Sequence, residues 1–180
     1  MRPSELAPAP SRPTLSAVYE AHFDYLCHTL RRLGVAPRNL EDVAHDVFLI
    51  VHRQLSTYDP TRPIRPWLFG IAYRVARDHK AKASVQREVH SELPERAASG
   101  PSQEEALDAE RRRELATRAL AGLSEDDRAV VILCDIDGAS GPDAALVLGI
   151  PLNTVYSRLR VARQRLVERL QRLDPKGAKE

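Results

Sequence analysis

The chain has 180 residues, of which 43% are hydrophobic and only 5% aromatic, a composition that favours small helical domains over β-sandwiches. The two cysteines, Cys27 and Cys134, lie too far apart in the sequence to indicate a disulfide framework. No apolar run has the length of a membrane span, and the Pro-rich N-terminus lacks the apolar core of a signal peptide. We therefore expect a protein of the reducing cytoplasm that does not insert into a membrane.

The distribution of charge is more informative than the formal net charge of +2. Arginine and lysine dominate the stretch 158–179, whereas acidic residues dominate the stretch 92–108. The basic end predicts a polyanionic partner, and the acidic stretch cannot bind the same polyanion. The two parts should therefore have different roles.

The spacing of apolar residues predicts three helices in the first half of the chain. The first covers residues 15–33. The second begins at Asn39, with Asp42 as its reciprocal capping partner. The segment 56–66 contains three prolines and predicts a stiff loop, after which a third helix covers residues 67–85.

A second set of helices begins near residue 109. Ser124 is expected to cap a helix at 125–135, with Asp127 as its N3 partner. A short helix follows at 142–148.

The elements together predict an all-α chain of two small helical domains joined by a flexible acidic linker. The predicted divisions are a disordered tail at 1–13, a domain at 14–90, the linker at 91–108, a second domain at 109–173 and a tail at 174–180.

Gly149 lies where a tight turn requires a positive φ, between the short helix and a long helix at 151–173. This arrangement has helix-turn-helix spacing. Val155, Leu159, Ala162 and Leu166 form an apolar stripe that should pack on the domain. The opposite face carries short polar and arginine side chains, which suit base edges in the major groove. The candidate DNA-binding residues of this helix are Asn153, Thr154, Tyr156, Ser157, Arg158, Arg160 and Arg163.

The arginines of this helix could have two kinds of role. Arg158, Arg163 and Arg165 are better placed for phosphates, which fix position, than for base edges, which specify sequence. The alternative is that they only form a solvated helix face.

Four segments carry a family resemblance, and they occur in order along nearly the whole chain. They are LEDVAHDVFLIVHRQL (40–55), PWLFGIAYRVARDHKAK (66–82), ALAGLSEDDRAVVILCDIDGAS (119–140) and LGIPLNTVYSRLRVARQRL (148–166). Together they resemble the extracytoplasmic-function (ECF) sigma factors, group 4 of the sigma-70 family. The resemblance implies that the first domain is similar to sigma region 2 and the second to sigma region 4.

The resemblance also implies a division of labour. The second domain would bind the −35 element as duplex DNA, and the first would bind core RNA polymerase and melt and capture the −10 element. The implied polymerase-binding residues are Asp42, His45, Asp46, Phe48 and Arg53. The implied −10 residues are Thr61, Arg62, Ile64, Arg65, Arg74, Arg77, Lys80 and Lys82.

The partners implied by the resemblance are core RNA polymerase, promoter DNA and an anti-sigma factor, with the free protein a monomer. Neither a cofactor nor a metal is expected, and no motif of an enzyme is present. In this family the linker threads the RNA channel of polymerase, where acidic residues could mimic RNA; a merely soluble spacer is the equal alternative.

The sequence departs from the family pattern at three places. Arg74 stands where members of the family frequently have Asn, and His45 stands where they usually have Gln. The residues 143–145 are Asp-Ala-Ala in place of Glu-Ile-Ala, and Leu146 is expected to compensate for the lost Ile.

Two further features of the first domain have more than one interpretation. A metal site among His22, Cys27, His28, His45 and His52 lacks a closely spaced ligand pair. Trp67, at a helix start, is expected in the core rather than stacked on a base.

Two other functions remain possible from the residues alone. A free-standing helix-turn-helix regulator would need a ligand pocket and a dimer. An adaptor that sequesters a partner would not need the arginine-bearing face of the last helix.

Overall fold

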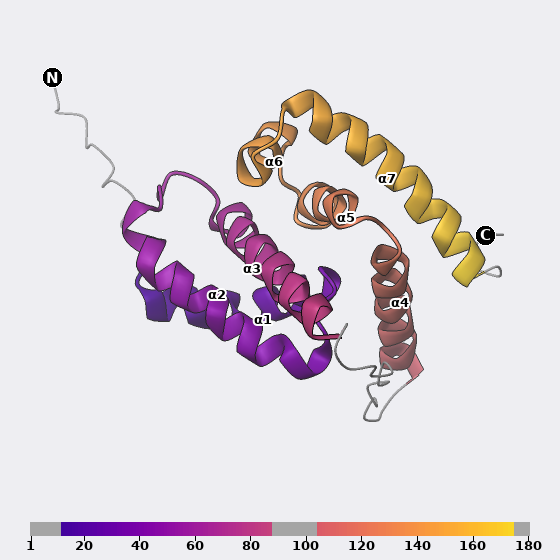
Figure 1. Cartoon of the computed structure of the whole chain (residues 1–180), viewed down its shortest axis with the longest axis horizontal. Coiled ribbons are helices and arrows are strands. Elements are labelled where there is room, and N and C mark those ends of the chain that lie inside the picture. The colour runs from indigo at the N-terminus through magenta and orange to yellow at the C-terminus, as the bar shows by residue number, and fades with distance from the viewer. Residues whose placement is uncertain (1–11, 88–103, 175–180) are drawn as a thin grey trace, which may run out of the picture.

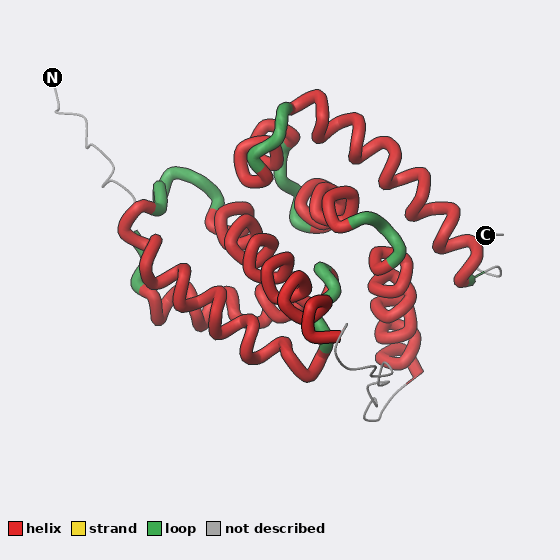
Figure 2. The backbone as a smooth tube through the Cα atoms, viewed as in Figure 1, coloured by secondary structure: helices red, strands yellow, loops and turns green. Residues whose placement is uncertain are grey.

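The computed structural model describes residues 12–87 and 104–174, and these residues form helices joined by short loops (Figure 2). The described part contains α1 (Leu15–Arg32), α2 (Leu40–Gln54), α3 (Ile64–Arg87), α4 (Glu104–Ala121), α5 (Glu125–Val131), α6 (Gly141–Leu148) and α7 (Leu152–Leu173). Short 3₁₀ turns precede and follow α2, and a π-helical turn, Ile132–Ile136, extends α5. The all-α class is confirmed.

The helices form two groups that lie side by side (Figure 1). Helices α1, α2 and α3 pack on one another, and α7 packs across α4, α5 and α6. The groups meet where α3 contacts α6 and where α1 contacts α4. Much of the predicted linker and most of the predicted tails lie outside the described residues.

Buried apolar side chains from both groups belong to one continuous cluster. In the first group, Leu26, Leu68 and Phe69 are completely buried. In the second, Val155 and Ala162 of the predicted stripe are completely buried and Leu159 is nearly so. The expected packing of α7 on its domain is therefore confirmed for these residues.

Two local signals in the second group act as predicted. The hydroxyl of Ser124 accepts a hydrogen bond from the backbone N–H of Asp127 at 3.2 Å, which caps α5. Gly149 ends α6 with a φ of 66°, in the left-handed region.

Several boundaries differ from the sequence-based expectation. Asn39 makes no side-chain cap to α2, because the 3₁₀ turn before it places its backbone in a helical conformation. Its amide Nδ2 instead lies 3.2 Å from His79 Nε2 on α3. Helix α3 begins at Ile64, since Pro66 falls in the first turn, where proline is tolerated. Helix α4 begins at Glu104, inside the predicted linker.

Leu146 does not compensate for the missing Ile of α6. Its side chain is 60% exposed, while Ala144 is completely buried. The leucine projects away from the core because it is two residues beyond the buried position, on another face of the helix. The prediction for Leu146 is wrong.

Candidate nucleic-acid and polymerase interfaces

The loop between α2 and α3 is closed by hydrogen bonds of its own side chains. Oδ1 of Asp59 accepts from the backbone N–H of Thr61 at 3.0 Å and from its hydroxyl at 2.7 Å, and these bonds lower the pKa of Asp59. Tyr58 donates from its hydroxyl to the carbonyl oxygen of Arg62, and burial raises the pKa of its phenol. The loop is therefore preorganised by residues 58–62.

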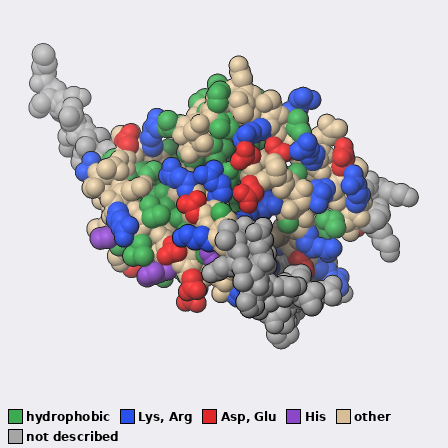
Figure 3. Space-filling view, in the orientation of Figure 1, with side chains coloured by type: hydrophobic (Ala, Val, Ile, Leu, Met, Phe, Trp, Pro, Cys, Tyr) green, Lys and Arg blue, Asp and Glu red, His purple; other side chains and the backbone are tan. Residues whose placement is uncertain are grey.

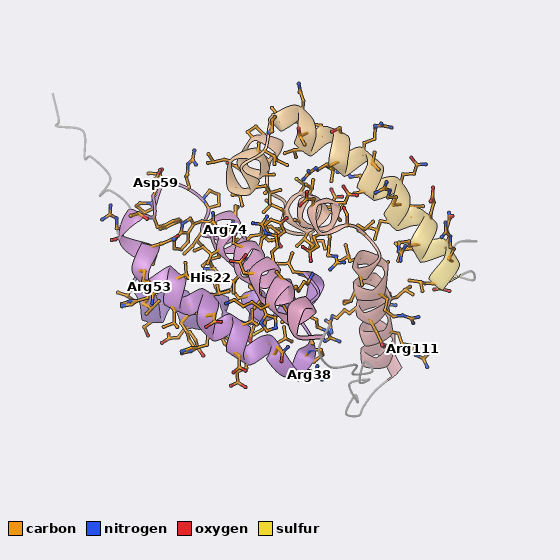
Figure 4. All side chains as sticks on the ribbon, viewed as in Figure 1. His22, Arg38, Arg53, Asp59, Arg74 and Arg111 are labelled. Carbon is orange, nitrogen blue, oxygen red and sulfur yellow. The ribbon has the colours of Figure 1, made fainter. Side chains whose placement is uncertain are left out.

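A cavity of about 280 Å³ opens beside this loop. Its aromatic wall is formed by Tyr58 and Trp67, whose ring centroids are 5.0 Å apart. Arg62 and Arg74 supply positive charge to the lining, while Asp59 and, from α6, Asp143 supply negative charge. The labelled positions of Asp59 on the loop and Arg74 on α3 can be followed in Figure 4. An aromatic wall beside arginines is suited to an unstacked base and its phosphate.

The predicted −10 residues separate into different places. Arg62 and Arg74 line the cavity, while Thr61 is held in the loop turn. Ile64 is half-buried and packs against the core. Lys82 is exposed.

The remaining predicted −10 residues engage protein groups. The guanidinium of Arg65 lies 5.2 Å from the ring centroid of Tyr25, and that of Arg77 lies 5.8 Å from the ring centroid of Tyr73. Lys80 pairs with Glu125 of the other helix group at 2.9 Å. The structure therefore gathers only part of the predicted set around one cavity.

Among the cavity residues that were not predicted as site residues, Tyr58, Asp59 and Trp67 bring aromatic or charged side chains from the loop and the start of α3. Trp67 was expected in the core, and it does pack there, but it also faces the cavity. Tyr58 could have been found because an aromatic side chain in a polar, proline-rich loop is unusual. Asp59 carried no signal beyond its place in a turn.

The predicted polymerase-binding residues of α2 lie mostly on its outer face. Asp42, His45, Asp46 and Arg53 are exposed, and Arg53 is labelled on that helix in Figure 4. Phe48 is only 6% exposed. It packs in an aromatic cluster with the rings of Tyr19 and Phe23, at centroid distances of 4.7 and 6.2 Å.

Phe48 therefore supports the face of α2 from within, while exposed Leu49 beside it reaches solvent. Sequence reasoning passed over Leu49 because an apolar residue on an amphipathic helix normally indicates the core.

The start of α7 presents the predicted base-contacting residues to solvent. Asn153, Tyr156, Ser157 and Arg160 are exposed, and Thr154 is half-buried. The hydroxyl of Ser157 donates to the carbonyl of Thr154 at 3.1 Å. This face is available to a DNA groove.

The predicted phosphate-binding arginines of α7 are engaged in ion pairs with the helix beneath. Arg158 contacts Asp126 at 2.9 Å, and Arg165 contacts Asp127 at 2.8 Å. Arg163 donates from Nε to Oδ2 of Asp135, in the π-helical turn after α5, at 3.0 Å. Since these carboxylates neutralise the arginines, DNA phosphates must compete for them. Arg160, in contrast, has no ion pair within residues 12–87 and 104–174.

Across residues 12–87 and 104–174, no three histidine, cysteine or acidic side chains gather in a way that could hold a metal ion. In those same ranges, no helix has the length and apolarity needed to cross a bilayer.

Comparison with known proteins identifies both halves of the chain. Residues 18–85 match the family model of Sigma-70 region 2, and residues 113–166 match that of Sigma-70, region 4. The RNA polymerase sigma factor CnrH of Cupriavidus metallidurans is 32% identical over 151 residues, which cover 78% of each chain. The ECF RNA polymerase sigma-E factor of Escherichia coli is 25% identical over 144 residues, 75% of each chain.

Solved structures give the same assignment. CnrH in complex with the cytosolic domain of CnrY aligns with a TM-score of 0.60 at 26% identity, over 87% of each chain. The sigma factor RpoE in complex with the anti-sigma factor NepR, from Bartonella quintana, aligns with a TM-score of 0.70 at 25% identity, over 85% of this chain and 94% of RpoE. With both sigma regions in order and a relative of this identity along most of its length, the chain belongs to the ECF sigma factors of the sigma-70 family.

Proposed function

We propose that this sigma factor binds core RNA polymerase through the outer face of α2, captures the −10 strand in the loop cavity, and recognises the −35 duplex with the start of α7. The observation that carries the proposal is the pairing of two nucleic-acid-binding features in one chain. One is a cavity with an aromatic wall and arginines, and the other is a helix-turn-helix with an exposed polar face.

Capture of the −10 strand is supported by the chemistry of the cavity. Extruding a base from a duplex costs a few kcal/mol, roughly, which stacking and phosphate contacts must offset. Tyr58 and Trp67 supply the stacking surface, and Arg62 and Arg74 supply the positive charge. Bonds within the loop fix this arrangement before DNA binds, so little ordering entropy is lost on binding.

Recognition of the −35 element is supported by the position of Arg160 on α7. An exposed arginine without an ion pair in the described part of the chain can form a bidentate contact to guanine. Arg158 and Arg163 can add phosphate contacts once DNA competes with their carboxylates.

Binding to core polymerase is supported by the charged outer face of α2. Asp42 and Asp46 lie on it exposed, held in place by Val43 and Val47 in the core beneath. Negative charge on this face suits a basic partner surface.

Control by an anti-sigma factor is part of the proposal. Two structural relatives, CnrH and RpoE, were solved in complex with the cytosolic domain of CnrY and with the anti-sigma factor NepR, respectively. The activity belongs in the cytoplasm, where bacterial transcription occurs, and RNA synthesis is catalysed by polymerase rather than by this chain.

The proposal is tested by transcription in vitro from a library of promoter fragments, using bacterial core polymerase with and without this protein. Discrete start sites should appear only when the protein is added. If the protein neither joins core polymerase nor starts transcription, a free-standing DNA-binding regulator becomes the better explanation.

A further inference from the structure

The two helices of the helix-turn-helix touch through a glycine and a tyrosine. A Cβ atom at Gly141, the first residue of α6, would lie 2.7 Å from Oη of Tyr156 on α7 and 2.9 Å from Cε1 and Cζ of the same ring. Carbon atoms that are not bonded to each other pack at about 3.5–4.0 Å. The phenol of Tyr156 therefore lies directly against the backbone of α6, and no side chain fits between them.

The backbone conformation does not require glycine at position 141. Within the described residues, positive φ angles occur at Gly34, Gly138 and Gly149, whereas Gly141 belongs to the helix α6. Glycine loses more conformational freedom on folding than alanine does, so it costs stability in a helix. The close approach of Tyr156 is thus the structural reason for a residue without a side chain here.

The start of α6 is a firm support for the tyrosine ring. The hydroxyl of Ser140 accepts a hydrogen bond from the backbone N–H of Asp143 at 3.2 Å, which caps the helix. Pro142 follows Gly141, and its own ring fixes its φ. A side chain added at position 141 would therefore displace the exposed phenol of Tyr156 rather than the helix.

Tyr156 is also one of the residues proposed to meet the −35 duplex. It is 53% exposed, on the same face of α7 as Asn153, Ser157 and Arg160. Hydrophobic side chains reach the surface over α6, and Lys and Arg line α7, in Figure 3. The hydroxyl of Tyr156 makes no hydrogen bond within residues 12–87 and 104–174, so it is free to bond a base edge in the major groove.

We propose that Gly141 is a positioning residue for −35 recognition: it lets the phenol of Tyr156 rest on α6, which fixes where the tyrosine hydroxyl meets the duplex. The inference rests on the function proposed above. A tyrosine hydroxyl can both donate and accept a hydrogen bond, so a mobile one discriminates poorly among base edges. A hydroxyl that packing holds in one place meets a single base pair and gains specificity.

The proposal is tested with Gly141→Ala, Tyr156→Ala and the double variant, each in the full chain. Transcription with core polymerase is measured on promoters that carry every single substitution of the −35 element and a constant −10 element. Gly141→Ala should reduce discrimination about threefold or more, at the base pair that Tyr156→Ala also affects. In the Tyr156→Ala background, the same glycine change should have no further effect, because both act through one contact.

Thermal unfolding separates positioning from damage to the fold. Gly141→Ala should unfold at the wild-type midpoint or above it, since alanine suits a helix better and only an exposed ring must move. Gly138→Ala is the control, because a Cβ atom there meets nothing within 4 Å but a φ of 72° strains any side chain. The control should lower the midpoint and leave the −35 preference unchanged.

Several results would overturn the proposal. Gly141→Ala could leave the −35 preference unchanged, alter it equally with and without the phenol of Tyr156, or unfold below the wild-type midpoint. An unchanged preference in Tyr156→Ala, or a changed one in the Gly138→Ala control, would also be incompatible with it. If the wild-type protein itself selects no −35 sequence, the function proposed above has failed and the inference fails with it.

Discussion

Tyr73 of α3 and Asp126 of α5 are 53 residues apart in the sequence, yet the phenol of one donates a 2.8 Å hydrogen bond to the carboxylate of the other. The other carboxylate oxygen of Asp126 contacts Arg158 of α7 at 2.9 Å. One acidic side chain therefore links α3 to α7. Burial and this bond together raise the pKa of Tyr73 to about 12.

Replacing Tyr73 with Phe should lower the free energy of unfolding by about 1–2 kcal/mol, since a hydrogen bond to a charged acceptor is lost. Urea unfolding of Tyr73→Phe, Asp126→Asn and the double variant gives the coupling energy between the two side chains. Tyr19→Phe, at an exposed tyrosine, is the matched control and should change stability little. A coupling energy near zero would show that this bond does not hold the groups together.

Arg128→Lys should destabilise the protein by about 2–4 kcal/mol. An ammonium cannot reproduce four guanidinium bonds to carbonyl oxygens, so several acceptors would be left unsatisfied. Arg160→Lys, on the exposed face of α7, serves as the control, and urea unfolding measures both. Similar midpoints for the two variants would contradict the role given to Arg128.

Asp137 should make stability depend on pH. Burial raises its pKa, although its bond from Tyr25 and the charges of Arg32 and Arg65 act in the opposite direction. The folded state therefore holds this proton more tightly than the unfolded state does. The stabilisation that comes from this more tightly held proton is fully present below 3.8, the usual pKa of Asp. It is lost as pH rises through the raised pKa of Asp137.

Urea unfolding at a series of pH values tests this dependence against Asp137→Asn, which cannot titrate. The difference in unfolding free energy between wild type and variant should fall as pH rises above 3.8, and then level off. A difference that rises with pH over this window would reverse the sign assigned to the carboxyl.

Arg160→Ala should weaken promoter use in a sequence-dependent way. Loss of a bidentate contact to guanine costs about 1–3 kcal/mol at the cognate base pair only. Arg165→Ala is the matched control, because that exposed arginine is paired with Asp127 and is expected to contact phosphates, so its loss should be equal on every promoter. Transcription from the promoter library compares both, and an equal loss on every promoter would exclude base recognition by Arg160.

Asp46→Arg should weaken binding to core polymerase about tenfold, since the change reverses a charge on the face proposed to meet a basic surface. Asp24→Arg makes the same change at an exposed position of α1. Affinity for core polymerase, measured with fluorescently labelled protein, should fall only for the first variant. Unchanged affinity would remove Asp46 from the interface.

Local features of the fold could be predicted from the sequence because neighbouring residues determine them. The serine cap of α5, the left-handed Gly149 and the apolar stripe of α7 each depend on a few residues within one or two turns. The cap at Asn39 failed because the 3₁₀ turn Pro37–Asn39 gives its backbone a helical conformation, and its amide Nδ2 lies 3.2 Å from His79, forty residues away. A contact over that separation leaves no mark in the local sequence.

The candidate site was less predictable for the same reason. The charged residues around 61–82 indicated nucleic-acid binding, but not which of them would turn toward protein. Lys80 pairs with Glu125 of the other group, and Arg65 of α3 lies over Tyr25 of α1, through contacts that only the packing of separate helices creates. The lining of the loop cavity by α6 belongs to the same class of long-range contact.

The π-helical turn at 132–136 determines how the helices after it are oriented. Its bond from the N–H of Asp137 to the carbonyl of Ile132 spans five residues, one more than an α-helix uses. Deleting one residue here would restore regular winding and turn everything beyond it by about 100°. Asp137 would then face away from Tyr25. The orientation of α6 and α7 relative to α5 thus depends on the one extra residue in this turn. We therefore expect the turn to tolerate substitutions far better than insertions or deletions.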